Sequence, residues 1–147
     1  FDYDKMLNFN GDTAIYILYS YARICSIIRK CFAETGISLK DCEKVSLMGP
    51  KTQTEWKLAL FVNRFDEYIE KSSEKLEPHI LCDYLYKLAS LVSQFLNKYR
   101  LLNLVPNDNK HVLDPEFGKS RLMILEATRK TIKTVLDILN IKALEKM

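Results

Sequence analysis

The sequence predicts an all-α fold, a bundle of about five to six helices that forms one domain over residues 1–147. Two observations favour this fold. Apolar residues recur with helical spacing along several long stretches, and no stretch shows the strict alternation of a strand. Only 4 glycines and 4 prolines occur in 147 residues, which is too few for the many turns of an all-β fold. A chain of this length buries enough surface to need neither a disulfide nor a metal for its stability.

The first helix is expected near the start of the chain. Asp12 or Thr13 can cap its first turn, and the apolar periodicity runs from there to about Glu34. Gly36 is placed to stop this helix, because glycine adopts the left-handed conformation of a helix C-terminus. A short helix is then expected over residues 38–47.

Three more helices are expected after the Gly-Pro break at residues 49–50. The first covers residues 52–65 and is capped by one of the two threonines at its start. The second covers residues 66–76. Pro78 suits the first turn of a helix, so it begins a long helix that continues over residues 79–99.

The last part of the chain is expected to hold a loop, a helix and a tail. The loop over residues 100–117 is rich in Asn, Asp and Pro, and loops of this length often carry function. The final helix runs from about Glu116 to Leu139, Asn140 caps it, and residues 141–147 form the tail.

Several classes of protein are excluded by the sequence. No run approaches the roughly 18 apolar residues of a membrane span, and the chain opens on Phe1 without a signal peptide, so it is interpreted as a fragment of a longer protein. The four cysteines lie in apolar patterns without Cys-x-x-Cys spacing, which predicts buried free thiols, no metal site and a reducing, cytoplasmic location. They are Cys25, Cys31, Cys42 and Cys82.

The net charge of +3 is too small to identify a nucleic-acid-binding protein by itself, but its distribution is uneven. Residues 1–76 carry 11 basic and 11 acidic side chains, whereas residues 77–147 carry 11 basic and 8 acidic ones. The whole excess of positive charge therefore lies in the second half of the chain.

Helical phase places an aromatic and basic stripe on the first helix. At about 100° per residue, Tyr16, Tyr19 and Arg23 fall on the polar side, opposite an apolar arc that runs from Ala14 to Phe32. An unpaired base can stack on a tyrosine ring, and arginine can grip a phosphate or stack on a base. The stripe therefore suits a single-stranded RNA loop rather than duplex DNA. The alternative is that a neighbouring helix covers the stripe and bonds its phenol groups.

Two further basic surfaces are candidates for the same role. One is the end of the helix over residues 79–99, where Lys98, Tyr99 and Arg100 precede the polar loop. The other is the last helix with its tail, which carries Arg121, Arg129, Lys130, Lys133, Lys142 and Lys146. The alternative for both is an ordinary solvated surface, because helix C-termini favour cations.

The motifs of a self-contained enzyme are missing from this sequence. It contains no P-loop, GxGxxG or HExxH motif, and its two isolated histidines do not support a Ser-His-acid triad. No pair of carboxylates stands out as general acid and base. Three hypotheses stay open: an RNA-binding module, a helical protein–protein interaction module without RNA recognition, and a free-standing enzyme, which is the least favoured.

Several separated segments resemble one known family in order and spacing. They are FDYDKML, GDTAIYILYSYARICSI, EWKLALFVNRF, LCDYLYKLAS, SRLMILEATRK and LNIKALEKM. Together they are similar to the C-terminal anticodon-binding (DALR) domain of arginyl-tRNA synthetases, and the eukaryotic cytosolic variety looks the most similar. The resemblance covers essentially the whole chain.

The resemblance implies both a function and a site. Domains of this family are all-α bundles that hold the anticodon loop of arginine tRNA, while a preceding class I catalytic domain binds ATP and arginine. The chain would then be a C-terminal fragment of an arginine–tRNA ligase, with no catalytic residue, cofactor or metal of its own, whose partners are the anticodon stem-loop and the catalytic domain rather than DNA or a membrane. The implied anticodon-binding residues are Tyr16, Tyr19, Arg23, Tyr99, Arg100, Lys146 and Met147.

The sequence departs from the family pattern at several positions, including Ala143 in place of the usual proline. Leu96 stands where many members carry a stacking tyrosine, a role that Tyr99 or Arg100 would then take. Lys146 replaces the usual arginine, which keeps the charge and loses the planar guanidinium. Asn140 replaces the usual glycine, and asparagine is the next-best residue for a left-handed cap.

Overall fold

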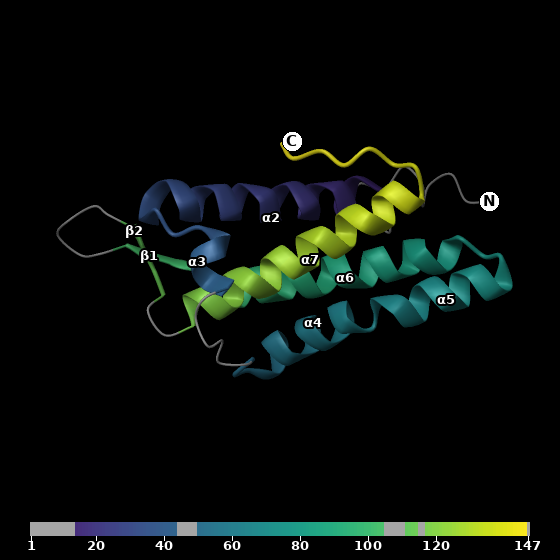
Figure 1. Ribbon diagram of the computed structural model, residues 1–147, viewed down its shortest axis with the longest axis horizontal. Coiled ribbons are helices and arrows are strands. Elements are labelled where there is room, and N and C mark those ends of the chain that lie inside the picture. The colour runs from purple at the N-terminus through teal and green to yellow at the C-terminus, as the bar shows by residue number, and fades with distance from the viewer. Residues whose placement is uncertain (1–13, 44–49, 105–110, 115–116, 147) are drawn as a thin grey trace.

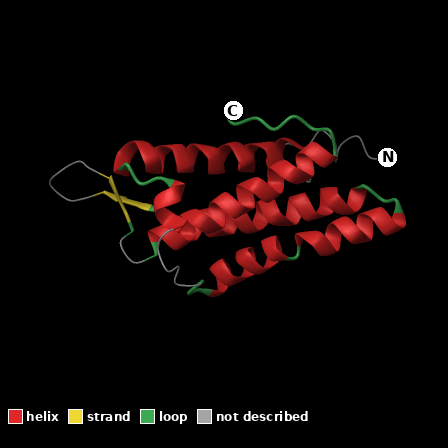
Figure 2. Cartoon of the chain, viewed as in Figure 1, coloured by secondary structure: helices red, strands yellow, loops and turns green. Residues whose placement is uncertain are grey.

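The computed structural model describes residues 14–43, 50–104, 111–114 and 117–146, and it confirms the all-α bundle (Figure 2). Six helices form this part of the chain. They are α2 (Ala14–Thr35), α3 (Leu39–Glu43), α4 (Gln53–Asn63), α5 (Phe65–Lys75), α6 (His79–Lys98) and α7 (Gly118–Ile138). None of these helices is long and apolar enough to cross a membrane.

The three long helices α2, α6 and α7 make the centre of the bundle (Figure 1). α2 lies against both α6 and α7, while α4 and α5 follow one another along the other side of α6. The side chains between these helices form one apolar core, in which Tyr21, Tyr84 and Phe95 are among the largest that are fully buried. The outer face of α2 stays at the surface, where the C-terminal tail runs along it (Figure 1).

Left-handed residues end three of the helices. Gly36 follows α2 at φ +68° and Asn140 follows α7 at φ +56°, and both confirm their predicted capping roles. After Asn140 the Ile141 N–H donates to the Leu136 carbonyl over 2.8 Å, the long-range bond of a Schellman turn. Leu76 ends α5 at φ +56°, although a leucine in this conformation is uncommon.

A capping box begins α4. The Thr52 hydroxyl accepts a hydrogen bond from the Glu55 N–H over 3.3 Å, and the Glu55 carboxylate accepts one from the Thr52 N–H over 3.1 Å. Of the two threonines that could begin this helix, the structure therefore selects Thr52. The same carboxylate also accepts from the Lys51 N–H over 2.7 Å.

A short β-hairpin lies in the segment predicted as a polar loop. β1 (Leu102–Leu104) and β2 (His111–Leu113) pair antiparallel. The sequence did not predict it, because three residues per strand are too few to show a recognisable alternation. Leu101 and Leu113 bury their side chains at its base and so join the hairpin to the core. The connection over residues 105–110 lies outside the described residues.

Some side chains are buried differently from the prediction. Tyr16 was expected on the polar side of the first helix, but it is half-buried because α2 packs against α6 as well as α7. Phe32 was expected in the core and is 58% exposed in the last turn of α2. Cys82 is exposed, whereas the other three cysteines are buried; all four are free thiols, as predicted.

Candidate nucleic-acid interface

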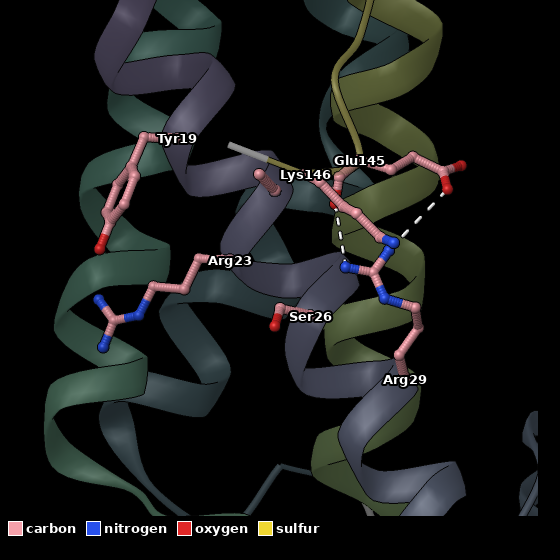
Figure 3. Close-up of a pocket in the computed structure, with 7 residues that line it drawn as sticks. Tyr19, Arg23, Ser26, Arg29, Glu145 and Lys146 are labelled. Carbon is pink, nitrogen blue, oxygen red and sulfur yellow. Dashed lines mark hydrogen bonds and ion pairs between the residues drawn. The ribbon is translucent and has the colours of Figure 1, made fainter.

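The outer face of α2 forms one wall of an open groove of about 380 Å³ (Figure 3). Tyr19, Arg23 and Ser26 follow one another along this wall, because residues three and four apart lie on one side of a helix. The Tyr19 side chain is 54% exposed. Figure 3 shows Tyr19 and Arg23 projecting on one side of α2 and Arg29 projecting on the other.

The C-terminal tail forms the opposite wall of this groove. It turns back at Asn140, and Ile141 and Ala143 pack against the core. Arg29 then contacts the tail. Its Nη2 donates to the Glu145 carbonyl over 3.1 Å, and its Nη1 lies 4.0 Å from the Glu145 carboxylate (Figure 3).

Residues predicted from distant segments meet in this groove. Tyr19 and Arg23 come from the predicted stripe on the first helix, and Lys146 comes from the tail. Lys146 lies more than a hundred residues from Tyr19 and Arg23 in the chain, and the backward path of the tail brings it to them. Met147, the last predicted binding residue, lies outside the described residues.

A second open hollow, of about 200 Å³, adjoins the groove at Arg23. The end of α6, the residues after it and one side of α2 line it, and its lining includes Arg23, Lys30, Leu96, Tyr99 and Arg100. Because Arg23 lines both depressions, the predicted stripe and the predicted end of the middle helix form one continuous surface.

Tyr16 faces α6 rather than the groove. Its hydroxyl donates to the Ser93 Oγ over 3.1 Å, and its ring centroid lies 5.7 Å from that of Tyr86. The alternative considered for the stripe, cover by a neighbouring helix, therefore holds for Tyr16 and not for Tyr19. A contact between Tyr16 and RNA stays a prediction; in this structure the side chain joins α2 to α6.

Tyr99 is fixed at the end of α6 by contacts on several sides. Its hydroxyl donates to the Thr52 Oγ1 over 2.7 Å, and the Arg121 guanidinium lies 4.5 Å from its ring centroid. Burial would raise the pKa of Tyr99, but hydrogen bonding to Thr52 and its other polar neighbours outweighs it, so the pKa is lowered. The next residue, Arg100, is exposed and adds its guanidinium to the charged groups of this hollow.

A buried polar cluster fixes α2 to α7 behind the groove. Arg129 donates to the Glu126 carboxylate over 2.7 and 2.8 Å and lies 3.5 Å from the Tyr21 hydroxyl. The hydrogen bonds from Arg129 lower the pKa of Glu126, and burial raises the pKa of Tyr21. Contacts to α6 and α7 therefore set the orientation of α2, and with it the direction of the groove wall.

The surface combines positive charge with an exposed ring. Arg23, Arg29 and Lys146 line the groove against one carboxylate, that of Glu145. The adjoining hollow adds Lys30 and Arg100. Such a surface can bind a phosphate backbone and stack an unpaired base. Within the described part of the chain, no group of three or more His, Cys, Asp or Glu side chains could hold a metal ion.

Sequence reasoning missed part of the groove lining. Ser26 lies three residues beyond Arg23, so extending the helical phase by one turn would have found it. Arg29 and Glu145 could not be found in this way. Their contact depends on where the tail runs, and helical periodicity says nothing about a tail without regular structure.

The bundle and its groove define a class, a helical domain with a surface suited to single-stranded RNA. Comparison with known families specifies it further. Residues 17–147 match the model of the DALR anticodon binding domain, and the chain belongs to this family.

Relatives of the chain include proteins named arginine–tRNA ligase. The chain is 42% identical over 149 residues to the ligase of Histophilus somni and 36% identical over 147 residues to that of Fusobacterium nucleatum. Both matches cover 100% of this chain but only 23% and 24% of the relatives. The chain thus spans about a quarter of the length of these proteins.

Solved structures agree with the family. Arginyl-tRNA synthetase from Plasmodium falciparum superposes over 100% of this chain and 23% of its own, with 32% identity and a TM-score of 0.76. The enzyme from Thermus thermophilus does so over the same shares, with 28% identity and a TM-score of 0.71. The predicted family is confirmed. The predicted eukaryotic cytosolic variety is not, because the first sequence relatives are bacterial.

Proposed function

We propose that this chain binds the anticodon loop of arginine tRNA as the C-terminal domain of an arginine–tRNA ligase. The observation that carries the proposal is the groove in which Tyr19, Arg23 and Lys146 converge. Membership of the DALR anticodon binding domain family supports it, as do the names of the relatives.

The chemistry of the groove suggests a division of roles. Tyr19 offers its exposed ring to a splayed anticodon base. Arg23 and Lys146 hold the phosphate backbone or a base edge, and Arg100 extends the positive surface towards the neighbouring nucleotides. The middle anticodon base, a cytosine, is the expected identity element. Binding this remote part of the substrate helps a distant catalytic domain by positioning the acceptor end of the tRNA.

The proposal extends to the parent enzyme. Residues 1–147 act as one recognition domain, the catalytic domain of the same protein is its second partner, and ATP and arginine bind there rather than here. The parent attaches arginine to tRNA in the cytoplasm. The eukaryotic cytosolic variety stays a prediction.

The test measures the affinity of the full-length enzyme for arginine tRNA. Tyr19→Ala should weaken binding by about 1–3 kcal/mol, because a stacking contact with a base is lost. Changing the middle anticodon base of the tRNA should likewise weaken its binding to the unmodified enzyme. Filter binding at fixed low salt gives both affinities, since salt strongly changes such values.

Trp56→Ala is the matched control. Trp56 is an exposed aromatic residue, 57% exposed, on α4, outside the groove lining. This variant should bind arginine tRNA as the unmodified enzyme does. Unchanged affinity for Tyr19→Ala, with an intact circular dichroism spectrum, would contradict the proposal and favour a module that recognises protein instead.

A further inference from the structure

We infer that Arg29 is a positioning residue for anticodon binding, which acts by clamping the C-terminal tail against α2 so that the tail forms the second wall of the groove. The inference rests on the proposed function, because it assumes that the groove takes the anticodon. No RNA contact by Arg29 itself is needed for it.

Among the residues that the structure describes, few contacts hold the end of the tail. Residues 141–146 form no helix or strand, and their first half is held by the turn at Asn140 and by the packing of Ile141 and Ala143. Among the described residues, this packing against the core does not extend beyond Ala143. Residues 144–146 are instead held by a hydrogen bond from Arg29, which donates to the Glu145 carbonyl over 3.1 Å.

The position of Arg29 suits a clamp. Arg29 and Glu145 line both the groove and a smaller hollow of about 190 Å³ on its other side. Their contact is therefore the ridge that separates the two depressions. If the ridge opened, the groove would lose its second wall and Lys146 would lose its place in the lining.

The clamp is local and does not hold the fold together. The side chains of Arg29 and Glu145 are 44% and 67% exposed, and exposed ion pairs add little to folding stability. Removing Arg29 should therefore free the end of the tail while the bundle stays folded. This separates a positioning role from a structural one.

The expected effect follows from the fraction of molecules with a docked tail. When only some molecules present the complete groove, the apparent Kd rises by the inverse of that fraction. If Arg29→Gln leaves the tail docked in roughly a tenth of the molecules, the Kd for arginine tRNA should rise about tenfold. Glu145→Gln keeps the backbone carbonyl that Arg29 contacts and should change the Kd less.

The experiment compares full-length enzymes by limited tryptic digestion without RNA and by tRNA binding. Arg29→Gln should speed cleavage after Lys142 in the freed tail, leave the helices protected, and raise the Kd. Arg64→Gln is the matched control, because Arg64 forms an exposed ion pair with Glu67 at the junction of α4 and α5, away from the groove. It should change neither measurement.

A truncation tests whether Arg29 acts through the tail. In an enzyme that lacks residues 144–147, Arg29→Gln should cause no further loss of affinity. A further tenfold loss would show direct binding of RNA by Arg29 and overturn the inference. Faster cleavage of the tail with unchanged affinity, or lost affinity with unchanged cleavage, would also overturn it. Tyr19→Ala runs in parallel: if it leaves the affinity unchanged, the proposed function fails, whereas the rate of tail cleavage still decides whether the clamp exists.

Discussion

At the scale of single residues, Glu55 is a buried carboxylate with several partners. It is 2% exposed, caps α4 through the N–H groups of Lys51 and Thr52, and accepts a 2.7 Å bond from Nε of Arg121 on α7. Arg121 in turn lies 3.4 Å from Asp114 and stacks on Tyr99. Through Arg121, one carboxylate thus joins the start of α4, the start of α7 and the end of α6, where the hollow lined by Tyr99 and Arg100 begins.

Replacing Glu55 by Gln should destabilise the protein by about 3 kcal/mol, because the buried Arg121 loses the closer of its two carboxylate partners and keeps only Asp114 at 3.4 Å. Chemical denaturation at pH 7 measures this loss. The exposed Glu70→Gln on α5 is the control and should change stability little. An unchanged denaturation midpoint for Glu55→Gln would contradict the role assigned to this carboxylate.

The same residue predicts a pH dependence. Burial alone would raise the pKa of Glu55, but the hydrogen bonds from Arg121, Lys51 and Thr52 lower it below its usual value. Its contribution to stability is therefore complete above the unfolded pKa of about 4.3 and is lost as the pH falls through the folded pKa. Denaturation between about pH 7 and pH 3 should show the unmodified chain and Glu55→Gln converging in acid.

At the scale of elements, the turn between α5 and α6 is strained. Leu76 sits at φ +56° and is 86% exposed, so its side chain gains almost no burial in return for a conformation that favours glycine. Leu76→Gly should stabilise the protein by about 0.5–1 kcal/mol. Asn140→Gly, at the same φ after α7, should gain less, because asparagine tolerates this region. Thermal denaturation of both variants measures the two gains in stability. A lower midpoint for Leu76→Gly than for the unmodified protein would contradict the prediction.

The elements also show what the sequence could predict. Helix ends marked by local chemistry, such as Gly36, Thr52 and Asn140, were predicted because a cap depends on residues within one turn. The strand pair at residues 102–104 and 111–113 was missed because the two strands are held by pairing with each other rather than by local preference. Helical phase left open whether a neighbouring helix covers Tyr16, because it shows where apolar residues lie, not how many neighbours cover the helix.

At the scale of the whole molecule, charge is segregated between two sides. The groove and its adjoining hollow gather Arg23, Arg29, Lys30, Arg100 and Lys146. α5, on the far side of α6 from α2 in Figure 1, carries four acidic and two basic residues. The net charge of +3 conceals this polarity. Helical phase and family motifs predicted the separate parts of the site. Only the folded chain shows that these parts lie side by side on one surface.

This polarity predicts which cations contribute to RNA binding. Each phosphate contact on a single strand releases counterions and adds about −0.7 to the slope of log K against log salt. Arg100→Gln should therefore make the slope for arginine tRNA about 0.7 less steep, if the exposed guanidinium meets one phosphate. Lys71→Gln removes an equal charge from α5 and should leave the slope unchanged, because its helix faces away from the groove. Binding titrations at several salt concentrations give both slopes. Equal changes would mean that the tRNA responds to the net charge of the domain and not to the groove.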